Sequence, residues 1–156
     1  MQSDAHFSVC GAFRYWLWRS WEEDSPVLNI VGLNPSTADA LKNDPTIRRC
    51  IGFAQDNGYG SLFVTNLFAY RATRPKDLFA AADPVGPDND SWLAKIADES
   101  TAVLLAWGNH GQFLERDQAV VDLLPAGFCL GINQTGTPKH PLYVRKDQLF
   151  LPYPPR

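Results

Sequence analysis

The chain has 156 residues, of which 45% are hydrophobic and 20% are charged, and its formal net charge is −3. This length and composition are typical of one globular domain, and no apolar run approaches the length of a membrane span. The negative charge does not favour duplex DNA as a partner, so a role on DNA would need a local basic patch.

The N-terminus and the cysteines indicate where the protein resides. The first ten residues lack the basic and then apolar pattern of a secretory signal. Cys10, Cys50 and Cys129 are far apart and form no CxxC pair, which excludes a zinc cage or a four-cysteine iron–sulfur site. We therefore expect reduced thiols in a cytoplasmic protein whose single domain covers residues 1–156.

In chain order, the first predicted element is a strand. Residues 12–21 are rich in aromatic side chains and partly alternate, which is typical of a strand, and a polar turn follows. This strand is expected to be antiparallel or at the edge of a sheet. Four further apolar runs, which predict strands, lie at residues 27–33, 61–66, 103–107 and 128–132.

Helical signals lie between these runs. Asp44 is a favourable N-cap, Pro45 suits the first helical position, and apolar residues at helical spacing continue to a stop at Gly58. Two further helices are predicted within residues 91–97 and 113–124. Strands that alternate with helices predict a three-layer α/β/α domain with a central, mainly parallel four-stranded sheet and an N-terminal edge strand.

Polar residues follow the predicted strands, and the carboxyl ends of parallel strands lie at one edge of the sheet. The first run is followed by Asn34, Pro35 and Ser36, the second ends at Asn66, and the last leads to His140. A basic segment follows Asn66 and contains Arg71, Arg74 and Lys76. No residues have metal-ligand spacing, and neither a phosphate loop nor a nucleophile elbow is present, so we expect no metal and no cofactor.

The sequence resembles the domain-of-unknown-function 1643 family over nearly its whole length. The resemblance is carried by the stretches GLNPSTAD, DPTIRRC, GYGSLFVTNLFAYRAT, AWGNHG and GTPKHPLYV. Three motifs are also similar, in the same order, to those of the uracil-DNA glycosylase superfamily. They are Gly32-Leu33-Asn34-Pro35, Thr65-Asn66 and His140-Pro141.

The second resemblance implies a fold and a set of roles. It implies a uracil-DNA-glycosylase-like fold in which Asn34 handles the attacking water, Asn66 reads a flipped base and His140 donates to the departing base. The amide at position 34 is similar to the mismatch-specific branch of the superfamily. Base contacts are expected from Gly32, Leu33, Pro35 and Ser36, and a wedge into the duplex is expected from Leu142 and Tyr143. The better-known members have Ser and Pro after the His-Pro pair, so the wedge loop of this chain is altered.

These features predict a hydrolase of the DNA glycosylase type, active in DNA repair, that cleaves the N-glycosidic bond of a uracil-like or modified base. We expect Arg71, Arg74 and Lys76 to contact backbone phosphates. Two alternatives remain, a non-catalytic module that binds a nucleotide or modified base and a hydrolase of free nucleosides or nucleotides. A purely structural interpretation also exists, in which Asn34 and Ser36 cap a helix and Asn66 forms a turn.

Overall fold

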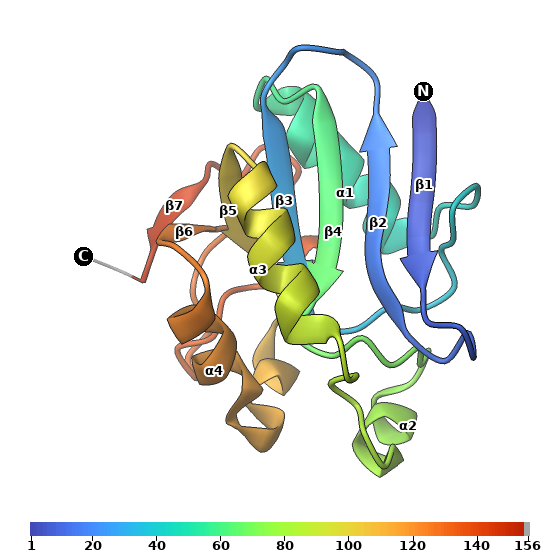
Figure 1. Ribbon diagram of the computed structural model, residues 1–156. Helices are drawn as coiled ribbons and strands as arrows, with labels where there is room; N and C mark the ends of the chain where they lie inside the picture. Colours follow the sequence, from blue (N-terminus) through green and yellow to red (C-terminus); the bar gives the residue numbers. More distant parts are fainter. Residues whose placement is uncertain (155–156) are drawn as a thin grey trace.

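The computed structural model describes residues 1–154, which form a seven-stranded mixed sheet with helices on both faces (Figure 1). The strand order is β1-β2-β4-β3-β5-β6-β7. The strands are β1 (Gln2–Phe7), β2 (Arg14–Ser20), β3 (Val27–Gly32), β4 (Ser61–Asn66), β5 (Ala102–Leu105), β6 (Gly127–Cys129) and β7 (Leu151–Tyr153).

Four adjacent strands, β4, β3, β5 and β6, are parallel to one another, and they correspond to the four predicted apolar runs. The sheet is nevertheless larger than the predicted four strands, because β1, β2 and β7 extend it with antiparallel pairs. Residues 12–21 contain the predicted strand, and its antiparallel pairing is confirmed. The prediction of an edge position is wrong, since β2 lies between β1 and β4. The N-terminal edge strand is β1, whose mostly polar sequence QSDAHF gave no apolar signal.

The helices largely follow the predicted signals. They are α1 (Pro45–Asp56), α2 (Pro75–Ala80), α3 (Asn89–Glu99) and α4 (Arg116–Leu123), with 3-10 helices η1 (Asn109–Glu115) and η2 (Pro141–Tyr143). Asp44 caps α1, because its Oδ1 accepts a hydrogen bond of 2.9 Å from the backbone N–H of Ile47. The helix predicted at residues 113–124 begins only at Arg116, because Phe113 and Leu114 have non-helical backbone angles.

Two hydrophobic cores, one on each face of the sheet, give the three layers. On one face, α1 packs its buried side chains Ile47, Cys50 and Ala54 against the strands. On the other face, Leu93 of α3 and Val120 of α4 contribute to the second core. Figure 1 shows α1 behind the sheet and α3 in front of it. The α/β/α layering predicted from the alternation of strands and helices is confirmed.

The parallel strands end in register at one edge of the sheet. Gly32 of β3 pairs with Asn66 of β4, and Val31 pairs with Leu105 of β5. The loops that follow these strands therefore leave the sheet side by side. Among residues 1–154, no helix is both long and apolar enough to cross a membrane.

Candidate functional site

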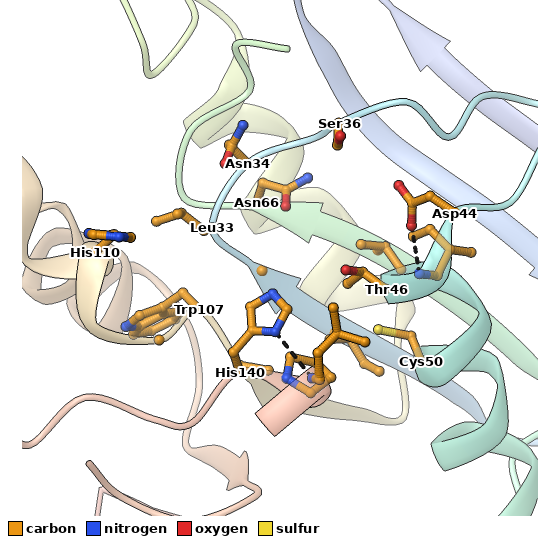
Figure 2. A pocket seen from close by; sticks show the side chains of 18 of the residues that line it. Leu33, Asn34, Ser36, Asp44, Thr46, Cys50, Asn66, Trp107, His110 and His140 are labelled. Atoms are coloured by element: carbon orange, nitrogen blue, oxygen red, sulfur yellow. Dashed lines mark hydrogen bonds between the residues drawn. The ribbon is translucent and has the colours of Figure 1, made fainter. Parts of the chain in front are cut away.

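A cavity of about 460 Å³ lies at the edge of the sheet where the four parallel strands end (Figure 2). This volume falls within the range of pockets that bind small molecules. Its lining comes from the ends of β3 and β4, the loops after the four parallel strands, the first two turns of α1 and Arg14 of β2. The predicted site residues that line it are Gly32, Leu33, Asn34, Ser36, Asn66, Arg74, His140, Leu142 and Tyr143.

Asn34 has an amide group of fixed orientation. Its Nδ2 donates to the backbone carbonyl oxygens of Pro35, at 3.0 Å, and Ala72, at 2.8 Å. Because both partners are pure acceptors, the other end of the amide must be the oxygen. Asn34 therefore presents Oδ1 as an acceptor, and it ties the loop after β3 to the loop after β4. No helix begins at Asn34 or Ser36, so the alternative interpretation of these residues as helix caps is wrong.

Asn66 lies deeper in the cavity and is 3% exposed. Its Nδ2 is buried and has no hydrogen-bond partner among the described residues. Leaving such a donor unpaired costs roughly 1–3 kcal/mol, and an acceptor that reached this group would remove that cost. Gly32 provides the room for the side chain, because a Cβ atom at position 32 would lie 3.0 Å from Asn66 Oδ1.

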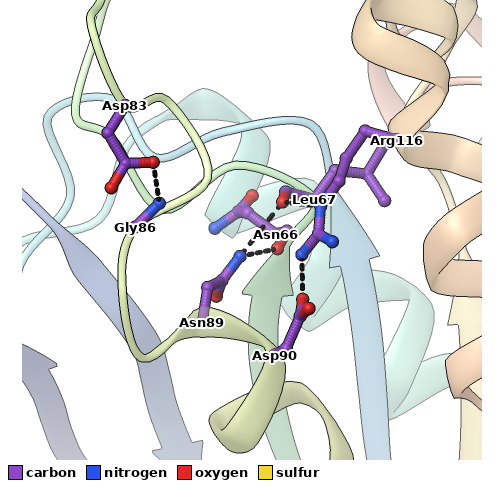
Figure 3. A network of polar contacts seen from close by, with 7 residues as sticks. All are labelled: Asn66, Leu67, Asp83, Gly86, Asn89, Asp90 and Arg116. Atoms are coloured by element: carbon purple, nitrogen blue, oxygen red, sulfur yellow. Dashed lines mark hydrogen bonds and ion pairs between the residues drawn. The ribbon is translucent and has the colours of Figure 1, made fainter.

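A buried polar network holds the backbone at the end of β4 from the opposite side of the sheet (Figure 3). Asn89 donates through Nδ2 to the carbonyl oxygens of Asn66 and Leu67, both at 3.0 Å. Arg116 donates through Nε to the carbonyl oxygen of Leu67 at 2.8 Å and forms an ion pair with Asp90. These contacts fix the backbone that carries the Asn66 side chain.

His140 contributes a neutral imidazole of defined tautomer. Its Nδ1 accepts a hydrogen bond of 3.1 Å from the backbone N–H of Leu142, so the proton of the neutral ring resides on Nε2. Burial lowers the pKa of His140 below 6.5, and the nearby charge of Asp44 opposes this shift. At neutral pH the ring therefore offers one N–H donor. Figure 2 shows the imidazole pointing into the cavity below Asn66.

The remaining predicted residues lie either at the rim of the cavity or outside it. Leu142 and Tyr143 form an exposed rim, at 37% and 83% exposure. Of the basic segment, only Arg74 lines the cavity, and it pairs with Asp77. Arg71 instead donates to the carbonyl oxygen of Gly11 and lies over the ring of Phe7.

Lys76 lies on α2, and neither Lys76 nor Pro35 is among the lining residues. Pro35 reaches the site only through its carbonyl oxygen, which accepts from Asn34.

Sequence reasoning missed several lining residues, above all Arg14 at the start of β2. The available signal was a charged residue in an aromatic strand, although Arg19 gives the same signal and does not line the cavity. Asp44 was predicted only as a helix cap, yet it lines the cavity as well. Cys50 is also part of the lining, but burial raises the pKa of its thiol to about 12, so it is no nucleophile at neutral pH. Within residues 1–154, no group of three or more His, Cys, Asp or Glu side chains has a metal-binding arrangement.

One comparison with known proteins gives a match. The family model described as "Protein of unknown function (DUF1643)" matches residues 14–142. The chain belongs to this family. The matched region runs from the first residue of β2 into η2 and so contains all of the cavity lining except Tyr143. No curated protein and no solved structure matches the chain significantly.

Proposed function

We propose that this protein hydrolyses the N-glycosidic bond of a uracil-like or modified base in DNA. One observation carries the proposal: a single cavity contains a fixed acceptor on Asn34, an unpaired buried donor on Asn66 and a neutral N–H donor on His140. The resemblance of the three motifs to the uracil-DNA glycosylase superfamily and the parallel core of the sheet support a fold of that type.

The reaction needs positioning more than covalent chemistry. The C–N bond breaks with its electron pair moving to the base, and the sugar becomes oxocarbenium-like before water oxygen bonds to its anomeric carbon. Asn34 Oδ1 accepts a hydrogen bond from that water and aims it at the sugar. An amide is too weak a base to deprotonate the water. The water proton therefore goes to the departing base or to solvent after the C–N bond has broken.

Asn66 and His140 act on the base. A carboxamide has both a donor and an acceptor, so Asn66 can bond a base carbonyl through Nδ2 and a ring N–H through Oδ1. The Nε2–H of His140 donates to a carbonyl oxygen on which negative charge develops, and this interaction strengthens as the bond breaks. The base must leave the DNA stack to reach this depth.

The charge distribution favours a second candidate, a hydrolase of free nucleosides or nucleotides. The net charge is −3, and only one of the three residues predicted to contact phosphates, Arg74, lines the cavity. A small substrate needs no extended basic surface.

Base release distinguishes these functions. The protein is incubated with oligonucleotides that contain uracil, hypoxanthine or a mismatched base, and in parallel with free nucleosides. Base released from the oligonucleotides supports the DNA reaction, and release only from the nucleosides supports the second candidate. If substrates bind but no base is released from any of them, both hydrolase functions are contradicted and the non-catalytic binding module remains.

A further inference from the structure

Arg14 is a buried cation with unused hydrogen-bonding capacity at the cavity. It is 2% exposed and lines the cavity from β2, beside the parallel core. Within residues 1–154, only its Nη1 has a hydrogen-bond partner, the carbonyl oxygen of Ala38 at 3.0 Å, and its buried Nε has none. Among the described residues it forms no ion pair with a carboxylate.

Arg19, five residues further along β2, is an internal reference for this residue. It is 1% exposed and also holds the loop before α1. Its Nε bonds Asn43 Oδ1, and both of its terminal nitrogens bond backbone carbonyl oxygens. Arg19 does not line the cavity. The loop before α1 bonds two of the three guanidinium nitrogens of Arg19, and the carbonyl oxygens of Asp4 and Trp18 bond the third. A buried guanidinium on β2 can therefore have a partner for every nitrogen, and among the described residues Arg14 does not.

The buried charge of Arg14 favours an anion. Burial is the main cause that lowers the pKa of Arg14 to about 10, so the guanidinium remains charged at neutral pH. Asp44 opposes this shift, and Arg71 and Arg19 contribute to it. Asp44 caps α1 and forms no ion pair with Arg14 among the described residues. A buried charge without a partner is costly, and a negatively charged ligand oxygen would remove that cost.

We propose that Arg14 binds a negatively charged oxygen of the ligand in this cavity. Two sources of such an oxygen fit the site, the carbonyl oxygen of a departing base that carries developing charge and the phosphate of a free nucleotide. The inference deepens the proposed function and rests on its nucleobase pocket. It does not rest on bond cleavage, because binding is measurable without turnover.

The test compares the unaltered protein with Arg14→Gln and with Arg19→Gln as matched control. Binding of uracil, uridine, uridine 5′-monophosphate and a uracil-containing oligonucleotide is measured by calorimetry, and each variant's thermal unfolding midpoint is recorded. Loss of one charged hydrogen bond predicts that Arg14→Gln weakens binding by about tenfold or more. Arg19→Gln is expected to lower the unfolding midpoint while its folded fraction binds all ligands normally.

The pattern of loss identifies the source. A loss confined to the nucleotide assigns Arg14 to phosphate, and an equal loss for every uracil ligand, with slower base release, assigns it to the base oxygen. Arg14→Lys, which keeps the charge, is expected to retain part of the affinity. If Arg14→Gln does not fold, two other measurements replace it. They are the competition of inorganic phosphate with uridine 5′-monophosphate for the unaltered protein, and the affinities of Arg14→Lys for the same probes.

Three results would overturn the inference. They are equal affinities in Arg14→Gln and the unaltered protein, parallel losses in the Arg14 and Arg19 variants, and no binding of any probe by the unaltered protein. If Arg14→Gln does not fold, the overturning result is that phosphate does not compete while Arg14→Lys binds every probe like the unaltered protein. Arg14-dependent binding without base release would keep the inference and reject the proposed hydrolysis.

Discussion

Asn34 joins a structural role and a proposed chemical role in one side chain. Its amide hydrogens hold the carbonyl oxygens of Pro35 and Ala72, and its oxygen remains free for the cavity. Aspartate, a chemically reasonable acceptor of a water proton, has no hydrogens for these two carbonyl oxygens. The residue type is therefore explained by the loops as well as by the proposed chemistry.

We expect Asn34→Ala to lower the free energy of unfolding by about 1–3 kcal/mol and to reduce base release by about a hundredfold or more. Urea unfolding and base release per folded molecule are measured together. Asn57→Ala is the matched control, because Asn57 Nδ2 also donates to a backbone carbonyl oxygen, that of Phe53 at 2.8 Å, and Asn57 does not line the cavity. Equal losses of activity in the two variants would reduce Asn34 to a loop anchor.

The lowered pKa of His140 predicts a pH dependence of stability. This pKa is 6.5 in the unfolded chain and lower in the folded protein, so between the two pKa values the unfolded chain binds more protons than the folded protein. Stability is therefore full above pH 6.5 and falls as the pH decreases from 6.5 through the folded pKa. His140→Asn, which keeps an acceptor for the Leu142 N–H, is expected to lack this component. Unfolding midpoints of both proteins from pH 7.5 to about pH 5 measure the difference, and parallel curves would contradict the prediction.

At the scale of elements, side chains of α3 and α4 help to hold the end of β4. Arg116 of α4 and Asn89 of α3 both donate to the carbonyl oxygen of Leu67. The helices thereby fix the backbone from which Asn66 projects into the cavity on the other side. Under the proposed function, this contact would couple stability to base selection.

Arg116→Met is expected to cost about 1–3 kcal/mol of stability and to weaken discrimination between bases, since Asn66 gains freedom. The control is Lys95→Met, which breaks the exposed pair of Lys95 with Glu99 on α3 at a cost of about 0.2–1 kcal/mol. Chemical unfolding and the ratio of base-release rates on uracil and hypoxanthine substrates give the two readouts. If Arg116→Met discriminates between the two bases like the unaltered protein, the polar network does not influence base recognition.

The close approach of β3 and β4 gives a second prediction at this scale. A Cβ atom at Gly32 would lie 3.0 Å from Asn66 Oδ1, so Gly32→Ala is expected to displace the amide and reduce binding or base release. Gly52→Ala on α1 is the matched change, because nothing lies within 4 Å of its Cβ and helix propensity improves by about 0.5–1 kcal/mol. Activity measured for both variants at equal folded fraction checks this, and a fully active Gly32→Ala would contradict it.

The elements also show what the sequence can predict. The parallel core was predictable because its strands are apolar runs separated by segments with helical signals. Asn34, Asn66 and His140 line one cavity because they lie at or after the carboxyl ends of such strands. The outer strand β7 was not predictable, because it has three residues and contains Pro152. Arg14 was missed because it enters the site from an antiparallel strand, whose pairing with β4 depends on tertiary contacts.

At the scale of the whole molecule, the number of contacts with backbone phosphates distinguishes a DNA substrate from a small substrate. A phosphate contact contributes about one unit to the slope of log affinity against log salt. Arg74 lines the cavity and keeps its guanidinium at the surface, whereas Arg71 is engaged with Gly11 and Phe7.

We therefore expect Arg74→Gln to reduce the salt slope of oligonucleotide binding by about one unit and Arg71→Gln to reduce it by less. Lys76→Gln, on α2 outside the cavity lining, serves for comparison. Binding titrations at several salt concentrations measure the slopes. Identical slopes in all three variants and the unaltered protein would mean that these residues do not contact DNA phosphates, and would favour the small substrate.

The position of β3 between β4 and β5 has a consequence for how the protein is made. Both partners come later in the chain, β4 at Ser61–Asn66 and β5 at Ala102–Leu105. Translation proceeds at about 5–20 residues per second, so the apolar residues of β3 wait for several seconds before both neighbours have emerged from the ribosome. Such non-local pairing is slow to form and prone to aggregation. We accordingly expect nascent chains that stop before β5 has emerged to aggregate more readily than the complete chain.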